Sequence, residues 1–250
     1  MKVKRWQDNI TFILVETEEQ GNIGASARAI FNMGFQNLAL VNPPSITSEA
    51  YWFAHNAEEV LDRCQIYDDL NQALIGKSVI ACTTRRYGRK RGLFVSPSEG
   101  SQMIYDAAKA GKVAILFGRE SKGLENDEIN ECGLLITIPS SKKAPSLNLS
   151  HAVLLIAYEI MKYDLFHSKE DYNYLDGHDS LVYREDQESI IERLREVLDI
   201  LGYGQKGTID MKEKIITNFR RMFRRGGLTR WEADMFSGLL SRIDEMVRGR

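Results

Sequence analysis

Three segments combine glycine or proline with polar side chains that could hold a ligand. Residues 16–28 read ETEEQGNIGASAR, residues 117–124 read FGRESKGL and residues 138–148 read IPSSKKAPSLN. Glycine lets backbone N–H and C=O groups come close to a bound molecule. The asparagine, serine, glutamate and arginine side chains add hydrogen-bond donors and acceptors. Each segment alone fits a turn or a helix start, with Ser146 as an N-cap, but the three together form a specific signal.

Each of these segments follows an expected strand. Short apolar runs predict strands that are buried on both faces, at residues 10–16, 37–41, 78–83, 112–117 and 134–138. Helices are predicted at residues 24–34, 52–61, 98–110 and 148–163, with Ser98 as the N-cap of the third. Strands that alternate with helices predict an α/β fold, with a mostly parallel sheet between helices. Ligands bind such sheets at the carboxyl ends of the strands, where the three segments should meet.

The rest of the chain differs in character from this part. Residues 1–163 are expected to form one domain. Residues 164–186 are polar and acidic, which is typical of a linker. Residues 187–250 predict a small all-helical extension, with helices at 187–201, 210–225 and 229–248 and a break at Gly226 and Gly227.

Composition narrows the class of protein. The chain has 250 residues, 43% of them hydrophobic and 27% charged, which is ordinary for a globular protein. No apolar run approaches the ~20 residues of a membrane span, and the N-terminus does not resemble a secretory signal. The three cysteines form no CxxC pair, which favours a reducing cytoplasm.

The net charge of −2 hides an uneven distribution. Residues 1–163 hold 18 basic and 18 acidic side chains, residues 164–202 hold 4 and 11, and residues 203–250 hold 11 and 6. A nucleic-acid partner is therefore not excluded, because local fields matter more than the total.

Several familiar motifs are absent or stand in the wrong place. Residues 202–207 match G-x-G-x-x-G but follow a helix, so a helix C-cap and turn is the better interpretation. The sequence contains neither a phosphate-binding P-loop nor a G-x-S-x-G elbow, and the four histidines lack metal-ligand spacing. We expect no metal.

The three segments, taken in order, resemble a known family. N-x-G-x-x-x-R-A, F-G-R-E-x-x-G-L and S-L-N-x-S-x-A are similar to the motifs of the SPOUT superfamily, in the SpoU (TrmH-like) branch of RNA ribose 2′-O-methyltransferases. The resemblance covers residues 8–163. It implies a C-terminal deep trefoil knot, a bent S-adenosylmethionine as cofactor with S-adenosylhomocysteine as product, and a homodimer whose RNA site draws on both subunits.

The resemblance also implies a role for individual residues. It places the cofactor contacts at Thr83, Thr84, Gly118, Gly123, Ile138, Ser146, Leu147 and Asn148. It places the catalytic site at Arg28, with Asn22, Glu120, Ser146 and Asn148 beside it. Because a guanidinium stays protonated, we expect Arg28 to clamp a phosphate and stabilise alkoxide charge. The proton would then go to the phosphate, to Glu120 or to water.

Two basic clusters predict an RNA surface. The first holds Arg85, Arg86, Arg89, Lys90 and Arg91, with Tyr87 among them. The second holds Arg220, Arg221, Arg224 and Arg225. Basic clusters with an aromatic residue suit phosphate contacts and base stacking. A solvated charged face is the alternative.

Three functions remain open at this point. Within this family, the order LVETxxxGNIGASARA, LVNP and SLNLSHAV, followed by a helical extension, most resembles members that act on tRNA. This resemblance implies methylation at the ribose of nucleotide 32, which opens the anticodon loop. A related enzyme acting on ribosomal RNA is the second. The third is a module that binds RNA and cofactor without catalysis, which the complete motif set disfavours. The apolar helix at 148–163 is a candidate dimer interface, although a buried core helix would have the same pattern.

Overall fold

The computed structural model describes residues 5–85, 93–167, 180–203, 205–206 and 209–248. Its centre is a seven-stranded sheet in the order β3-β2-β1-β6-β4-β7-β5, in which every pair of neighbours is parallel. The strands are β1 (Ile10–Val15), β2 (Leu38–Val41), β3 (Gln65–Tyr67), β4 (Val79–Thr83), β5 (Leu93–Val95), β6 (Val113–Phe117) and β7 (Leu134–Ile136). The predicted α/β sheet is therefore confirmed.

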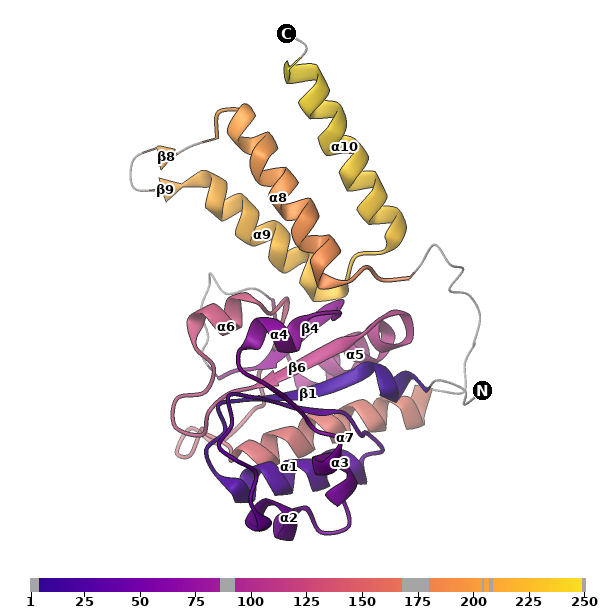
Figure 1. The fold of residues 1–250 in the computed structure, drawn as a ribbon, viewed down its shortest axis with the longest axis vertical. Coiled ribbons are helices and arrows are strands. Elements are labelled where there is room, and N and C mark those ends of the chain that lie inside the picture. Colours follow the sequence, from indigo (N-terminus) through magenta and orange to yellow (C-terminus); the bar gives the residue numbers. More distant parts are fainter. Residues whose placement is uncertain (1–4, 86–92, 168–179, 204, 207–208, 249–250) are drawn as a thin grey trace.

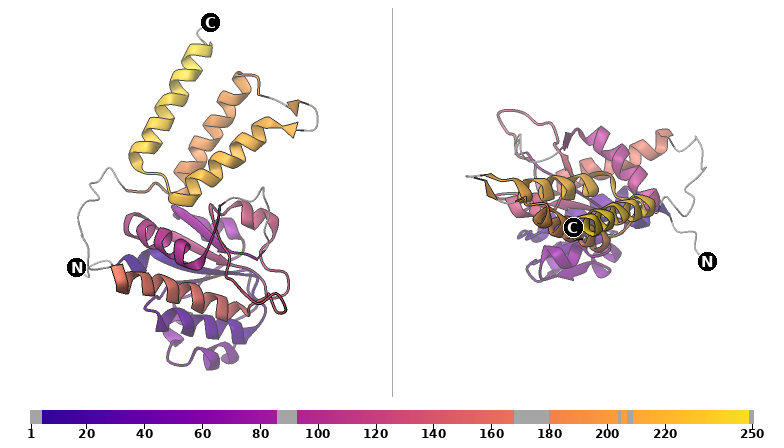
Figure 2. Two further views of the ribbon diagram at one scale, coloured as in Figure 1. Left: turned by 180° about the vertical axis from the view of Figure 1, so that it is seen from behind. Right: turned by 90° about the horizontal axis from the view of Figure 1, so that it is seen from above.

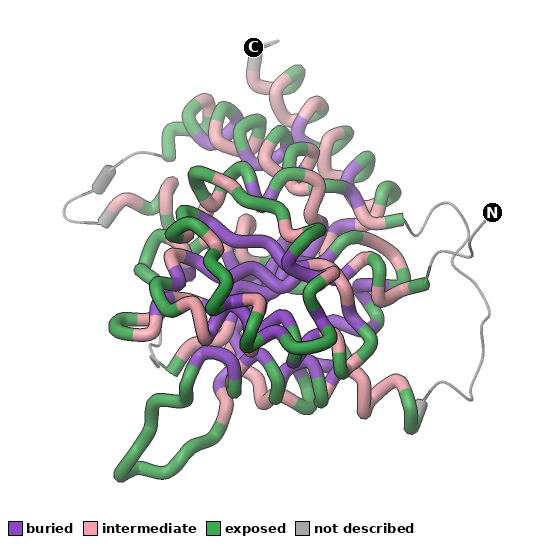
Figure 3. Tube along the Cα trace, turned by 60° about the horizontal axis from the view of Figure 1, so that its bottom comes forward, coloured by how far each residue is buried: buried purple, intermediate pink, exposed green. Residues whose placement is uncertain are grey.

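Helices cover both faces of the sheet (Figure 1). One face carries α1 (Gln20–Asn32), α5 (Pro97–Ala110) and α7 (Leu149–His167), with α2 (Ser48–Ala54) and α3 (Glu58–Asp62) packed beside α1. The other face carries the short helices α4 (Leu70–Leu74) and α6 (Asn126–Asn130). Figure 3 shows buried residues gathered at the centre of the sheet domain and exposed residues toward its outside. This arrangement explains why the central strands are apolar on both sides.

The predicted helix boundaries need correction in three places. Helix α1 begins at Gln20, so Asn22 lies in its first turn and not in a loop. The helix predicted at 52–61 is split into two, because His55 and Asn56 adopt positive φ angles of 32° and 63°. Ser96, not Ser98, caps α5, and its hydroxyl accepts a hydrogen bond from the Glu99 amide at 3.3 Å.

Short elements escaped prediction. Strands β3 and β5 have three residues each, and helices α4 and α6 have five. Such lengths are too short for a hydrophobic period to show. Residues 86–92, between β4 and β5, lie outside the described residues, and the trefoil knot stays a prediction.

The C-terminal segment forms three helices above the sheet (Figures 1 and 2). They are α8 (Arg184–Ile200), α9 (Met211–Gly226) and α10 (Arg230–Arg248), with a small antiparallel pair, β8 (Gln205–Lys206) and β9 (Ile209–Asp210), between the first two. These helices share their own apolar core, which includes Ile191, Phe223 and Leu240. We call α8, α9 and α10 the helical module.

The predicted linker is too long at both ends. Helix α7 extends to His167 and α8 starts at Arg184, while residues 168–179 lie outside the described residues. The turn predicted after α8 is confirmed at Gly202, whose φ is 78° and whose amide donates to the Asp199 carbonyl at 3.0 Å. Within the described residues, no helix is both long enough and apolar enough to cross a membrane.

The helical module packs directly on the sheet domain. Helix α9 contacts β4 and β7. At Gly133, just before β7, any Cβ would overlap the backbone of Arg224 and Arg225. A glycine is therefore required where the end of α9 meets the sheet.

Candidate active site

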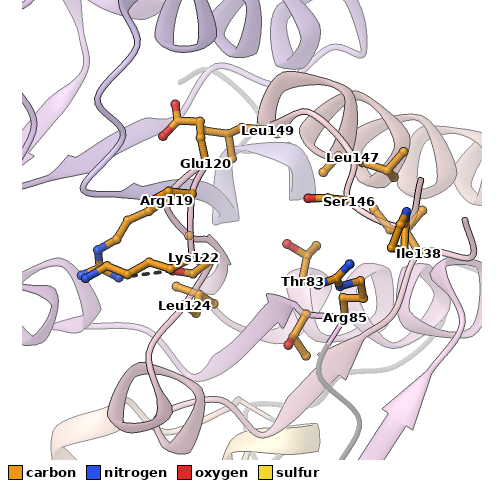
Figure 4. A pocket seen from close by; sticks show the side chains of 16 residues that line it. Thr83, Arg85, Arg119, Glu120, Lys122, Leu124, Ile138, Ser146, Leu147 and Leu149 are labelled. Carbon is orange, nitrogen blue, oxygen red and sulfur yellow. Dashed lines mark hydrogen bonds between the residues drawn. The ribbon is translucent and has the colours of Figure 1, made fainter. Parts of the chain in front are cut away.

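A cavity of about 210 Å³ opens at the carboxyl ends of β4 and β6 (Figure 4). Among the residues that line it are Thr83, Thr84, Arg85, Gly118, Glu120, Gly123, Ile138, Ser146 and Leu147. These include every predicted cofactor contact except Asn148. In Figure 4, Arg119 and Lys122 lie on one side, with Thr83, Ser146 and Ile138 on the other. The position matches the edge at which parallel sheets bind ligands.

The loop after β6 forms a tight rim of this cavity. The amide of Gly123 donates to the carbonyl of Arg119 at 2.9 Å, which closes the loop on itself. A Cβ on Gly118 would overlap the backbone of Gly123 and Leu124. Gly123 adopts a φ of 68°, a conformation that favours glycine. The two glycines are thus required for different reasons, one for space and one for backbone conformation.

Arg119 holds this rim in place from beneath. Its side chain is only 5% exposed. It donates to Glu16 at 2.7 Å and to both oxygens of Glu128 at 2.9 and 3.0 Å. The hydrogen bond from Arg119 lowers the pKa of Glu16. The sequence did not predict that Arg119 is buried, and its position two residues after a buried strand is the one local signal of burial.

Hydrogen bonds between side chains join the three motif segments. The amide of Asn22 donates to the carboxylates of Glu120 and Glu19, both at 2.9 Å. The amide of Asn148 donates to the Asn22 oxygen at 2.9 Å. Asn22 is 5% exposed, so this row of polar groups is ordered at the edge of the cavity. We call Glu120, Asn22 and Asn148 the polar row.

Asn148 also caps helix α7. Its side-chain oxygen accepts from the amide of Ser150 at 2.9 Å and from the Ser150 hydroxyl at 2.7 Å. The expected cap, Ser146, instead lines the cavity. The capping bond fixes the Asn148 oxygen toward the helix, which leaves its amide nitrogen to face Asn22.

The structure does not bring Arg28 to the cavity. Arg28 is exposed on α1 and is not among the lining residues. Six residues along a helix correspond to about 9 Å of rise and about 120° of rotation from Asn22. Asn22 and Arg28, which the resemblance places together, therefore face different directions within one chain.

Only some residues of the two predicted RNA-binding clusters are exposed in the described part of the structure. Arg85 is exposed and lines the cavity, and Arg225 is exposed at the end of α9. Arg86, Arg89, Lys90 and Arg91 lie outside the described residues.

Three arginines of α9 instead make contacts inside the protein. Arg224 is 1% exposed and donates to the Glu131 carboxylate at 2.7 Å and to Glu188. Arg220 donates to Glu188 at 3.0 Å, and Arg221 donates to Asn130 at 3.1 Å. A buried and paired guanidinium is not available to a phosphate, so we assign Arg224 to packing of the helical module and not to RNA.

In the cluster of Arg220, Arg224, Glu131 and Glu188, the cost of burying the charges is opposed by the attraction between them. Burial alone would raise the pKa of Glu188, but the hydrogen bond from Arg220 and the charge of Arg224 lower it overall. Burial lowers the pKa of Arg224, and Glu131 and Glu188 oppose that effect. Removal of one partner would leave a buried charge unpaired.

The described residues contain no group of three or more side chains suited to hold a metal ion. What they do contain is a parallel α/β sheet with a glycine-rimmed, polar cavity at its carboxyl edge, which defines the class of nucleotide- or cofactor-binding α/β proteins.

Comparison with known proteins narrows this class. The model of the SpoU rRNA Methylase family matches residues 9–158, and the chain belongs to that family. It is 35% identical to the tRNA (cytidine-2′-O-)-methyltransferase TrmJ of Methanocaldococcus jannaschii, over 90% of this chain and 95% of that protein. It is 34% identical to the tRNA (cytidine/uridine-2′-O-)-methyltransferase TrmJ of Sodalis glossinidius, over 94% of this chain and 91% of that one.

The similarity extends to three dimensions. The crystal structure of TrmJ from Z. mobilis ZM4 superposes with a TM-score of 0.73 at 28% identity, over 94% of this chain and 98% of that chain. The coverage includes the helical module as well as the sheet domain. The predicted family and the predicted α/β fold class are therefore confirmed.

Proposed function

We propose that this protein transfers a methyl group from S-adenosylmethionine to a ribose 2′-hydroxyl of tRNA and releases S-adenosylhomocysteine. The observation that carries the proposal is the polar row, which joins the three motif segments at the edge of one cavity. The tRNA substrate is supported by the names of the relatives, which span nearly the whole chain. We place the modified ribose at nucleotide 32, which opens the anticodon loop.

The cavity suits a cofactor that contains a nucleoside. Ile138, Leu147 and Leu149 supply apolar surface for a flat base. Thr83 and Ser146 supply hydroxyls, and the backbone around Gly118 can approach ligand edges without side-chain clash. When bound, S-adenosylmethionine supplies an electrophilic methyl group on its sulfonium, so the reaction needs no metal.

The remaining task of the protein is to orient the ribose hydroxyl. Glu120 is half-buried at the cavity, and the Asn22 amide fixes one of its oxygens. This carboxylate is our candidate proton acceptor, beside the substrate phosphate and water. Asn148 donates to the side-chain oxygen of Asn22 and so fixes the direction in which the Asn22 amide nitrogen points.

We further propose that the enzyme works as a homodimer. Helix α7 exposes Leu154, Leu155 and Tyr158, each at 37–43%, on the helix that packs against α1. Burial of this apolar face would favour association. Because Arg28 is exposed on α1, a second copy on this face would allow Arg28 to serve the site of the other subunit.

The basic residues near the cavity and at the end of α9 are our candidates for contact with RNA. Arg85 and Arg225 are exposed in the structure, and Arg86, Arg89, Lys90 and Arg91 follow Arg85 in sequence. Contacts of this kind release counterions, so tRNA affinity should fall steeply as salt rises. Binding that is flat between low and moderate salt would contradict a phosphate-dominated surface.

A methylation assay tests the activity and its substrate together. The protein is incubated with tritiated S-adenosylmethionine and either tRNA or ribosomal RNA, and ribose methylation is mapped by resistance to alkaline cleavage. We expect label in tRNA at nucleotide 32. Label only in ribosomal RNA would favour the second candidate, which the name of the matching family supports. No label in either would leave a module that binds cofactor or RNA without catalysis.

A further inference from the structure

The short helix α6 touches both the cavity rim and the helical module. On one side, Glu128 of α6 holds the guanidinium of Arg119 with two hydrogen bonds, at 2.9 and 3.0 Å. Arg119 belongs to the loop between Gly118 and Gly123 that rims the cavity. The same Glu128 carboxylate accepts from the Glu125 amide at 2.6 Å, which caps the first turn of α6. The position of α6 and the position of the rim are thus fixed together.

On its other side, α6 ends in contacts with the helical module. Glu131, which caps the C-terminal end of α6, accepts from Arg224 at 2.7 Å and from Arg184 at 3.0 Å. Its backbone carbonyl accepts from Arg224 as well, at 3.1 Å. Asn130 accepts from Arg221 at 3.1 Å. One carboxylate and one side-chain amide of α6 are therefore tied to three arginines of α8 and α9.

Among the contacts between the module and α6, the one made by Arg224 is close and its guanidinium is buried. Arg224 is 1% exposed, and no side chain fits at Gly133 between the end of α9 and β7. Arg224 also pairs with Glu188 of α8, so its guanidinium cannot turn away from Glu131 without breaking a second ion pair. Packed interiors of this kind transmit small displacements because they do not compress.

We propose that Arg224 and Glu131 are positioning residues for the cofactor site, acting through α6, Glu128 and Arg119 on the rim loop. Neither touches the cavity. This inference rests on the proposed function, in that the rim at residues 118–123 is taken to bind S-adenosylmethionine. It gives the helical module a second role: besides any contact with RNA, it stabilises the shape of the cofactor site in the sheet domain.

The test measures binding of S-adenosylhomocysteine by calorimetry in the absence of RNA, on the full-length protein. Arg224→Met removes the two hydrogen bonds from Arg224 to Glu131 and keeps those from Arg184 and Arg221 to α6. Arg195→Met is the matched control, because Arg195 pairs with Glu192 and Glu213 inside the helical module. We expect Arg224→Met to weaken binding by about two- to thirtyfold, the range of couplings carried through packed side chains. Arg195→Met should stay within about twofold of the wild-type Kd.

Two further measurements separate positioning from general destabilisation. Hydrogen exchange should become faster at the amides of residues 119–124 in Arg224→Met but not in Arg195→Met. If circular dichroism shows that Arg224→Met is unfolded, Glu131→Gln replaces it, since it keeps the side-chain shape and removes the charge. Unchanged affinity in a folded Arg224→Met or Glu131→Gln variant would overturn the inference. Failure of the wild-type protein to bind S-adenosylhomocysteine would instead overturn the proposed function.

Discussion

Asn148 performs two tasks with one side chain. Its oxygen accepts from Ser150 and caps α7, while its nitrogen donates to Asn22 in the polar row. Asparagine is suited to this position because one amide carries both a donor and an acceptor. Loss of the capping bond should lower the stability of the protein, whereas loss of the bond to Asn22 should change the geometry of the site.

An aspartate at this position separates the two tasks. Asn148→Asp keeps the capping oxygen but replaces the donor with a second acceptor that faces the Asn22 oxygen. We expect a melting temperature close to wild type and methylation of tRNA that falls by about five- to 150-fold, since loss of one such hydrogen bond costs about 1–3 kcal/mol. Asn148→Ala should also lower the free energy of unfolding by about 0.5–2 kcal/mol. Full activity in Asn148→Asp would remove the polar row from the mechanism.

Lys77, which lies away from the cavity, should make the stability of the protein depend on pH. Burial lowers the pKa of Lys77 to about 8, and its ammonium donates to the Thr11 hydroxyl at 2.7 Å. In the unfolded chain the pKa of a lysine is close to 10.4. Between these two values the unfolded state binds more protons, so folding becomes more favourable as pH rises.

Lys77→Met tests this linkage. The wild-type protein should gain stability relative to Lys77→Met between pH 8 and pH 10, by an amount on the order of 1–3 kcal/mol. Chemical denaturation at several pH values measures the difference, and comparison of the two proteins cancels the tyrosines that titrate in the same range. Parallel pH profiles would mean that the Lys77 ammonium keeps its charge at little cost in the folded protein.

At the scale of elements, the loop after β6 depends on backbone proximity. Gly118 has no room for a Cβ, because the backbone of Gly123 and Leu124 lies against it. Gly238, in the middle of α10, has nothing within 4 Å of the position where a Cβ would stand. The two glycines therefore predict opposite results for the same substitution.

Gly118→Ala should displace the rim and weaken binding of S-adenosylhomocysteine by about five- to 150-fold, because overpacking at such a site costs about 1–3 kcal/mol. Gly238→Ala should leave that affinity unchanged. It should raise the free energy of unfolding by about 0.5–1 kcal/mol, since alanine is the better helix former. Calorimetry and urea denaturation give both values. Equal affinities in the two variants would mean that the rim does not contact the cofactor.

At the scale of the whole molecule, the feature that needs an explanation is the position of Arg28. It is exposed on α1, outside the cavity of its own chain. A homodimer in which the subunits exchange this residue would reconcile its exposure with a catalytic role. The exposed apolar face of α7 lies on the neighbouring helix, which makes such an exchange geometrically consistent.

Subunit complementation distinguishes action within a subunit from action between subunits. Arg28→Ala and Gly118→Ala should each have little activity as homodimers when the concentration of S-adenosylmethionine is held below the wild-type Kd. If Arg28 serves the partner's site, a 1:1 mixture refolded together should recover about a quarter of the wild-type rate, since half of the dimers are mixed and each holds one intact site. Recovery is not expected if Arg28 acts in its own subunit. Substantial activity of Arg28→Ala alone would remove it from catalysis.

Much of this protein could be predicted from its sequence. The buried strands give continuous apolar runs, and parallel strands place their carboxyl ends at one edge, so the three motif segments had to meet there. Local chemistry also predicted the turn at Gly202 and the helices of residues 187–250, but not where these helices pack. These features depend on residues close together in the chain, where period and turn preference act directly.

Only the tertiary structure decided which side chains are exposed to a ligand and which are buried against other side chains. Arg224 and Arg225 are neighbours in sequence, yet the former is buried against Glu131 and Glu188 while the latter is exposed. Asn148 and Asn22 meet across 126 positions. Apolar residues reveal an element by their repeat along the sequence, but a single charged or amide side chain has no such repeat. Its partner therefore depends on which elements pack together. That packing decides the polar row, the burial of Arg119 and the contacts that hold the helical module to α6.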